Sequence, residues 1–160
     1  MSAEAQLATM RIRAAREADA PELARLSAQL GYPSGAAAMR ERLARIGARA
    51  DHAVFVAEPL EAPAGNASAA LLGWVHVGGG IWLESGESAE ILGLVVGAAA
   101  RRGGVGRRLV AAAEQWSRAA GLARIVVRSN AVRPEAHAFY PKLEYALAKT
   151  QRVYVKSLSP

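Results

Sequence analysis

Cysteine is absent from the 160-residue sequence, which excludes disulfide bonds and thiol chemistry. Metal-site spacings are absent too, because the three histidines, His52, His76 and His137, lie far apart in the sequence. No apolar run approaches the length of a membrane span, and the N-terminus lacks the apolar core of a signal peptide. We therefore expect a cytoplasmic protein that binds neither a metal ion nor a membrane.

What is present is the composition of one globular domain. Hydrophobic residues make up 52% and charged residues 21% of a chain long enough to bury a substantial core. The net charge of +6 would suit nucleic-acid binding, but the basic residues are spread along the chain and interleaved with acids. We expect a single domain over residues 1–160 and no nucleic-acid partner.

The densest basic cluster lies in the stretch 90–120, which we interpret as a buried strand, a glycine-rich turn and an amphipathic helix. Residues 91–96 (ILGLVV) are an apolar run of strand length. Residues 101–106 (RRGGVG) form the turn. The helix that follows has apolar residues at helical spacing and charged residues on its other faces.

The turn has the chemistry of a phosphate site. Glycines let the backbone approach a ligand closely, and the first amides of a helix attract an anion. Arg101, Arg102, Arg107 and Arg108 flank these amides. A nucleoside-triphosphate loop would need Gly-Lys-Ser/Thr at the helix start. A dinucleotide fingerprint would need a third small residue where Leu109 stands, so neither motif fits.

The rest of the chain supplies elements for an α/β fold. A first helix is expected to begin at Asp19, which would form a capping box with Glu22. A second helix is expected to follow and to end at Gly47. A loop is expected over residues 59–70, and a right-handed crossover is expected to make the strands on either side of the long helix parallel. A short helix is expected over residues 134–143. Further strands are expected over residues 9–15, 52–58, 71–77, 124–128 and, as a last antiparallel strand, 148–158.

Two motifs carry a resemblance to a known family. The turn residues Val96, Ala98, Arg101, Gly104 and Gly106 resemble the Val-x-Pro-x-x-Arg/Gln-x-x-Gly-x-Gly/Ala signature of the GNAT superfamily of N-acetyltransferases, with Ala98 in place of the common proline. Asn130 and residues 136–145 (AHAFYPKLEY) resemble the family's Asn…Ala-x-x-Phe-Tyr-x-x-Leu-Gly-Phe/Tyr segment. Glu144 stands where glycine is usual, so a positive φ there would cost about 1 kcal/mol.

The resemblance implies a fold and a coenzyme site. The fold would be a mixed, mostly antiparallel sheet with one splayed parallel strand pair and helices on both faces. In the family, the turn amides hold the pyrophosphate of acetyl-coenzyme A, and the preceding strand and the asparagine contact the pantetheine arm. The coenzyme-binding residues implied here are Leu94, Val95, Val96, Arg101, Arg102, Gly103, Gly104, Val105, Gly106, Arg107, Asn130 and Tyr140.

The resemblance also implies catalytic roles. Amine acetylation needs a base for the amine, a donor for the developing oxyanion and a proton for the leaving thiolate. Tyr140 would be the general acid. Glu90 would be the general base, directly or through a water molecule, with Glu84 and Glu87 as alternatives. His76 and His137 are interpreted as packing or hydrogen-bonding residues.

We therefore predict an acetyl-coenzyme A-dependent N-acetyltransferase that transfers the acetyl group directly, because no cysteine can carry a covalent intermediate. The three glutamates indicate a cationic small-molecule amine as acceptor, and residues 136–140 resemble aminoglycoside and other small-amine acetyltransferases. Acetylation of a protein amine, a non-catalytic acyl-coenzyme A sensor and a nucleic-acid-binding module stay open as alternatives. The sequence is compatible with a monomer or a homodimer.

Overall fold

The computed structural model describes residues 9–60 and 70–158. These residues form two units, one that ends at Val127 and one that begins at Arg128. The loop expected over residues 59–70 lies mostly outside the described residues. No helix in the described part of the chain is long and apolar enough to cross a membrane.

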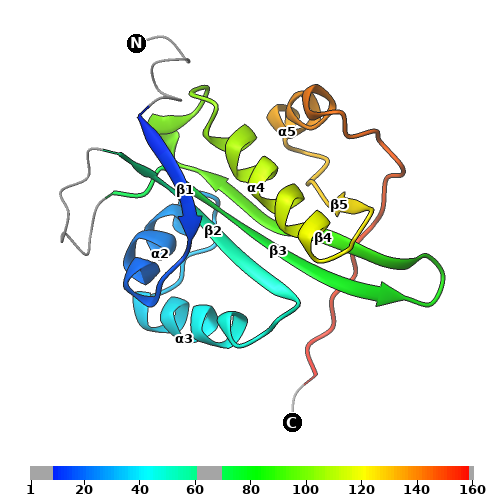
Figure 1. The fold of residues 1–160 in the computed structure, drawn as a ribbon, viewed down its shortest axis with the longest axis horizontal. Helices are drawn as coiled ribbons and strands as arrows, with labels where there is room; N and C mark the ends of the chain where they lie inside the picture. Colours follow the sequence, from blue (N-terminus) through cyan, green and yellow to red (C-terminus); the bar gives the residue numbers. More distant parts are fainter. Residues whose placement is uncertain (1–8, 61–69, 159–160) are drawn as a thin grey trace. The chain divides into compact units, whose positions relative to one another are not determined.

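The first unit is built on a five-stranded sheet (Figure 1). Strands β1 to β4 are antiparallel neighbours in chain order, and β4 pairs in parallel with β5. The predicted mixed sheet with one parallel pair is confirmed. The strands are β1 (Met10–Ala14), β2 (His52–Pro59), β3 (Gly73–Trp82), β4 (Gly86–Val96) and β5 (Ile125–Val127).

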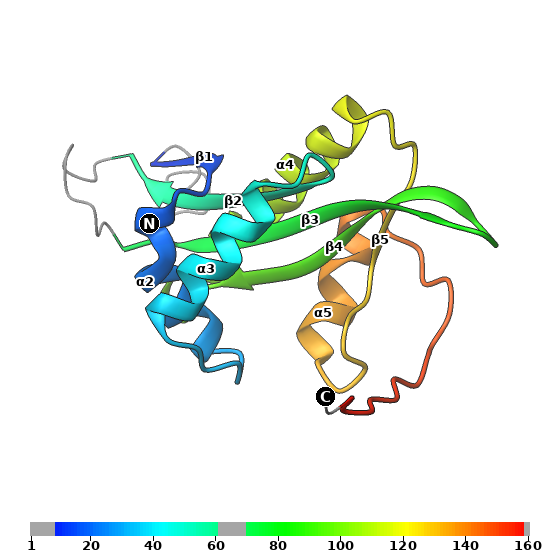
Figure 2. The ribbon, with the colours of Figure 1, turned by 90° about the horizontal axis from the view of Figure 1, so that it is seen from below.

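Helices cover both faces of this sheet (Figures 1 and 2). On one face, Leu26 of α2 (Ala20–Ala28) and Leu43 of α3 (Ala36–Gly47) are buried with Val56 and Val95. On the other face, α4 (Val105–Ala119) packs so close to β3 that a Cβ on Gly73 would lie 3.1 Å from a methyl group of Leu109. The predicted α/β layering is therefore correct, and the buried core consists mostly of branched aliphatic side chains and alanines.

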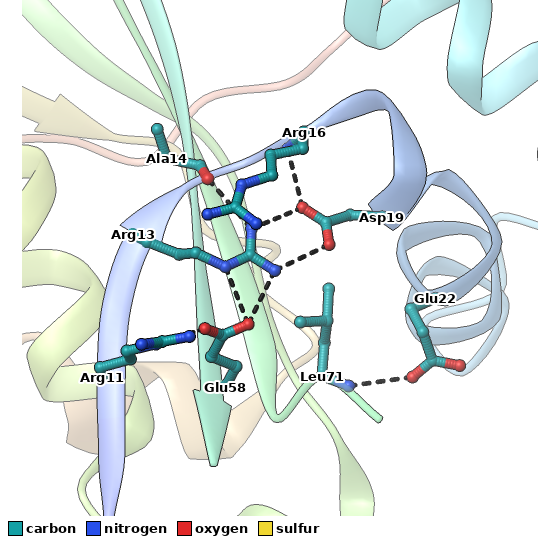
Figure 3. A network of polar contacts seen from close by, with 8 residues as sticks. All are labelled: Arg11, Arg13, Ala14, Arg16, Asp19, Glu22, Glu58 and Leu71. Atoms are coloured by element: carbon teal, nitrogen blue, oxygen red, sulfur yellow. Dashed lines mark hydrogen bonds and ion pairs between the residues drawn. The ribbon is translucent and has the colours of Figure 1, made fainter. Parts of the chain in front are cut away.

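A polar network joins β1 and β2 to the start of α2 (Figure 3). Arg13 lies between two buried carboxylates: its Nη1 donates to Asp19 Oδ2 at 2.7 Å, and its Nε donates to Glu58 Oε2 at 2.8 Å. Arg11 also donates to Glu58, and the Arg16 backbone N–H donates to Asp19. Such charge-assisted bonds are strong and fix the entry of the chain into α2.

The capping box predicted for α2 is wrong. Asp19 precedes the helix but makes no side-chain capping bond, because its carboxylate is engaged by Arg13 and by the Arg16 amide. Glu22 accepts instead from the Leu71 backbone N–H at 3.0 Å and from Arg25. Arg13 binds Asp19 through two parallel N–H···O bonds between opposite charges, whereas a capping amide would offer one N–H without a full charge.

We expect the network to make stability fall in acid. Burial opposes ionisation of Asp19, but the bonds from Arg13 and Arg16 outweigh it, so the pKa of Asp19 is lowered. The Arg13 bond, against a smaller effect of burial, likewise lowers the pKa of Glu58. A lowered pKa adds stability above the unfolded-state value, roughly pH 4, and loses it as pH falls through the folded-state value. Urea unfolding at pH 7 and pH 3 checks this. In a Glu58→Gln variant, which has one titrating group fewer, the free energy of unfolding should fall less between pH 7 and pH 3.

The second unit contains α5 (Pro134–Phe139) and a 3₁₀ turn, η3 (Pro141–Leu143). Pro141 separates them, since it has no amide hydrogen with which to continue the helix. Glu144 follows with φ of 66°, so this residue does adopt the positive φ that glycine would accept without strain. The predicted last strand is wrong: residues 148–158 carry no regular secondary structure. Their alternating pattern does not suffice, since a strand exists only where a partner completes its ladder.

Candidate functional site

A tight turn joins β4 to α4. Gly97 precedes a short 3₁₀ turn, η2 (Ala98–Ala100). Two residues then adopt positive φ, Arg102 at 65° and Gly104 at 78°. This conformation is open to glycine but costs an arginine about 1–2 kcal/mol. Strain of this kind often marks ligand sites.

The first amides of α4 are uncapped. The N-cap residue, Gly104, has no side chain, and no described side chain caps the helix in its place. The first backbone bond of the helix runs from the Arg108 N–H to the Gly104 carbonyl at 3.1 Å. The N–H groups of Val105, Gly106 and Arg107 therefore point out of the helix end. Together with the helix dipole they form a site for an anion.

The four arginines around these amides have different surroundings. Arg101, Arg102 and Arg107 are exposed, and Arg101 Nε donates to the Val96 carbonyl at 3.4 Å. Arg108 is half-buried, and its Nη1 donates to the Met10 carbonyl at 2.7 Å, which ties α4 to β1. Three of the four cations are thus placed to meet an anion from solvent.

A β-bulge interrupts β4 just before the turn. His76 of β3 faces Gly93, while the next residue, Val77, faces Ile91, so Leu92 is the extra residue. The parallel pairing with β5 covers Ala89 to Ile91 and ends where the bulge begins. Bulges bend and twist a strand, so the bulge would favour the predicted splay of the parallel pair.

Beyond the bulge, β4 presents amides along an open edge. The Gly97 N–H donates to the Leu72 carbonyl, on the β3 side of the strand. Because amide direction alternates along a strand, the N–H groups of Leu94 and Val96 point the other way, to the edge that β5 has left. Val95 is turned inward: its side chain is 2% exposed and its amide faces β3. The open edge therefore offers the amides of Leu94 and Val96.

The three candidate bases occupy different places. Glu84 and Glu87 are exposed at the outer end of the β3–β4 hairpin. Glu90 is half-buried within the sheet, opposite Gly78 of β3 and beside Val126 of β5. Of the three, Glu90 has the partly buried position on β4 that a general base near the splay would need.

Asn130 and Tyr140 belong to the second unit. Asn130 is exposed, and its Oδ1 accepts from the Val132 N–H at 3.1 Å. Tyr140 ends α5, with its ring edge-on to Phe139 at 5.1 Å and to Tyr145 at 5.7 Å between centroids. Burial raises the pKa of the Tyr140 phenol, so the group keeps its proton at neutral pH.

The sequence did not predict a contact between two histidines on neighbouring strands. His52 Nδ1 lies 2.9 Å from His76 Nε2, and the ring centroids are 5.1 Å apart. The predicted hairpin of β2 and β3 brings these strands together, but only its register shows that the two rings meet.

Known proteins share this fold. A model of the acetyltransferase (GNAT) family matches residues 17–145, and no curated protein matches the chain. A GNAT family acetyltransferase from Staphylococcus aureus superposes with a TM-score of 0.70 at 20% identity, over 94% of this chain and 99% of that one. Aminoglycoside N-acetyltransferase AAC(6')-Iy, in complex with a bisubstrate analogue of coenzyme A, gives 0.75 at 18%, over 93% and 99%. Glucosamine-6-phosphate N-acetyltransferase from Arabidopsis thaliana gives 0.76 at 18%, over 93% and 99%.

At these identities the solved structures establish the fold, and the family match, which spans most of the chain, establishes the relationship. The glycine turn and the segment around Tyr140 had pointed to the same family. The chain therefore belongs to the acetyltransferase (GNAT) family.

Proposed function

We propose that this chain transfers the acetyl group of acetyl-coenzyme A directly to a primary amine of a small, cationic molecule. The observation that carries the proposal is the uncapped start of α4 behind Gly104, beside an open edge of β4. The sequence has no cysteine that could hold an acetyl group in between, which supports direct transfer.

The residues of the turn fit a coenzyme pyrophosphate. The amides of Gly104 to Arg107 would bind its oxygens, and the exposed guanidinium groups of Arg101, Arg102 and Arg107 would balance its charge. Gly103 is buried and Gly104 is left-handed, which favours glycine at Gly104 and lets the backbone come close to the ligand. Asn130 is proposed to contact the pantetheine arm.

The open edge of β4 would serve the reacting end of the coenzyme, which supplies the acetyl group as a thioester. The N–H groups of Leu94 and Val96 would donate to pantetheine and to the carbonyl oxygen as negative charge develops there. Val95 would anchor this strand in the core rather than touch the coenzyme.

Proton transfer is assigned to two side chains. Glu90 would accept a proton from the amine, because an ammonium group has no lone pair with which to attack. Tyr140 would donate a proton to the leaving sulfur. Its raised pKa keeps the phenol protonated, so the donor is present at neutral pH.

The acceptor class is inferred from charge and from relatives. Glu84, Glu87 and Glu90 all lie on or beside β4, and carboxylates attract a cationic amine. Related structures include enzymes named for aminoglycoside and glucosamine-6-phosphate acetylation, both small amines. A protein amine is the alternative acceptor.

Thiol release from acetyl-coenzyme A, measured with a panel of aminoglycosides, amino sugars and polyamines, tests the proposal. We expect release to depend on an amine, and we expect Arg107→Glu to raise the dissociation constant of coenzyme A about 10- to 100-fold, or about 1.4–2.8 kcal/mol. The substitution puts a carboxylate where the pyrophosphate would lie. An acidic residue in the first turn suits a helix, so folding should not suffer.

Arg40→Glu on α3 is the matched control. Arg40 is an exposed helical arginine, and its replacement changes the net charge equally. It should leave coenzyme binding unchanged. Coenzyme binding without amine-dependent thiol release would indicate a sensor. Wild-type affinity in Arg107→Glu would refute the assignment of the turn.

A further inference from the structure

Three polar side chains surround Gly78 on one face of the sheet. Gly78 of β3 faces His52 of β2 on one side and Glu90 of β4 on the other. His76 stands two residues earlier on β3 and therefore shares this face. Glu90 is its diagonal neighbour, about 7–8 Å away in the backbone, which long side chains or one water molecule can span.

The absent side chain of Gly78 is what lets these groups meet. A Cβ at this position would lie 2.8 Å from His52 Cε1 and 3.0 Å from a methyl group of Leu92, the bulge residue. The His52 ring thus lies over Gly78, on the face of the sheet that it shares with Glu90. Gly78 and the bulge at Leu92 together make room for the imidazole of His52, which lies in the same cross-strand row as Gly78 and Glu90.

The two imidazoles share a single hydrogen bond. His52 Nδ1 and His76 Nε2 are 2.9 Å apart, so one of these nitrogens carries the proton and the other accepts it. Burial, and to a smaller extent the charge of His52, lower the pKa of His76 to about 4. His76 is therefore neutral at pH 7, and the pair can pass a proton along without holding a lasting charge.

Other charged groups near this face are occupied or exposed. Across the three sheet strands and the two helices that pack here, Glu90 is the carboxylate beside the pair. The other charged groups of these elements and of the segments beside them include Arg13 with Asp19 and Glu58, Glu22 with Arg25, Arg49 with Asp51, and the exposed Arg40, Glu41, Arg42, Arg45, Glu84 and Glu87.

We propose that His76 and His52 form a relay that carries the amine proton from Glu90 to solvent. This inference rests on the proposed function. His52 is the solvent end, because it opens β2 next to the exposed Asp51. His76 and His52 act through Glu90 and are positioning residues rather than groups that touch the substrate.

The relay balances as follows. The ammonium N–H bond breaks and the proton joins Glu90, which becomes a carboxylic acid. Glu90 returns to carboxylate when its proton passes to His76 Nδ1. His76 Nε2 then gives its proton to His52 Nδ1, and His52 Nε2 releases one to water. One proton leaves the ammonium and one enters solvent, so no other reactant is needed.

The test compares His76→Gln and His52→Gln with the wild type between pH 6 and pH 10, using the best amine from the panel. We expect each variant to lower kcat about tenfold at pH 7. The KM for acetyl-coenzyme A and the coenzyme dissociation constant should not change. Above the pKa of the acceptor amine the defect should shrink, because the amine then arrives without the proton. The double variant should be no slower than either single one, since the two residues act as a unit.

His137→Gln on the exposed face of α5 is the control and should match the wild type. Wild-type kcat in either relay variant overturns the relay, and so does a defect of equal size at every pH, which is the mark of a structural role. Protection of each variant by coenzyme A in thermal unfolding verifies that it is folded. If the wild type binds coenzyme A but acetylates no amine, the proposed function itself fails. If the wild type acetylates an amine and the His76→Gln and His52→Gln variants do so at the same rate, only the relay fails.

Discussion

Replacing Tyr140 by phenylalanine is expected to lower kcat about 100-fold while the KM for the amine stays nearly constant. Loss of a positioned general acid typically costs 10²–10⁴-fold, and the phenol is the group we assign to the leaving sulfur. The ring contacts with Phe139 and Tyr145 do not involve the hydroxyl group, so the fold of the second unit should be unchanged. Steady-state thiol release, with coenzyme binding measured separately, checks the expectation.

Tyr154→Phe removes a hydroxyl group from an exposed tyrosine of the same unit and serves as its control. It should turn over like the wild type. A wild-type kcat in Tyr140→Phe would show that Tyr140 is not the general acid. The thiolate would then take its proton from water.

Arg13→Ala is expected to destabilise the protein by about 3–5 kcal/mol, because it leaves two carboxylates without the cation they share. The side chains of Asp19 and Glu58 are only 9% and 6% exposed, so both carboxylates depend on partners within the protein for their hydrogen bonds (Figure 3). For a chain of this size, such a loss lowers Tm by roughly 10 °C. Chemical denaturation at pH 7 measures it directly.

Arg45→Ala is the matched comparison. Arg45 and Glu41 are 80% and 73% exposed, and an exposed pair of this kind contributes roughly 0–1 kcal/mol. We expect a change below about 0.5 kcal/mol. A loss of under 1 kcal/mol in Arg13→Ala would mean that the network is held by its backbone contacts and not by the guanidinium.

The sequence was most informative where local chemistry decides the structure. The turn at Gly104 and the start of α4 follow from residue types a few positions apart, and the structure has both. The segments that form the five strands followed from apolar periodicity, and the parallel pairing across α4 followed from the handedness of crossovers.

The features that the sequence did not reveal depend on register between distant segments. Arg13 meets Glu58 across 45 positions, and the histidine pair forms across 24. A shift of one residue in either strand pairing would separate these side chains. The capping box failed for a local reason, since Arg13, six positions earlier, and the Arg16 amide engage Asp19. The predicted last strand failed because its pattern fixes no partner.

Register also explains why β3 is longer than predicted. The strand predicted over residues 71–77 continues to Trp82, because the missing side chains of Gly78 and Gly80 make room for the rings of His52 and Trp82. Glycine within a strand can mark close approach by a neighbour as well as a break.

The bulge at Leu92 makes the number of residues in β4 matter more than their identity. Upstream of it, even-numbered Glu90 faces the histidines, whereas downstream odd-numbered Gly93 and Val95 occupy that face. Deleting one residue here would turn the side chain of Glu90 to the opposite face if the downstream part of β4 kept its pairing. If the upstream part kept its pairing, the amides of Leu94 and Val96 would turn to the opposite edge. Across related chains, substitutions within this segment should therefore be far commoner than insertions or deletions, because a change of length would disconnect the proposed proton acceptor from the edge proposed to bind the coenzyme.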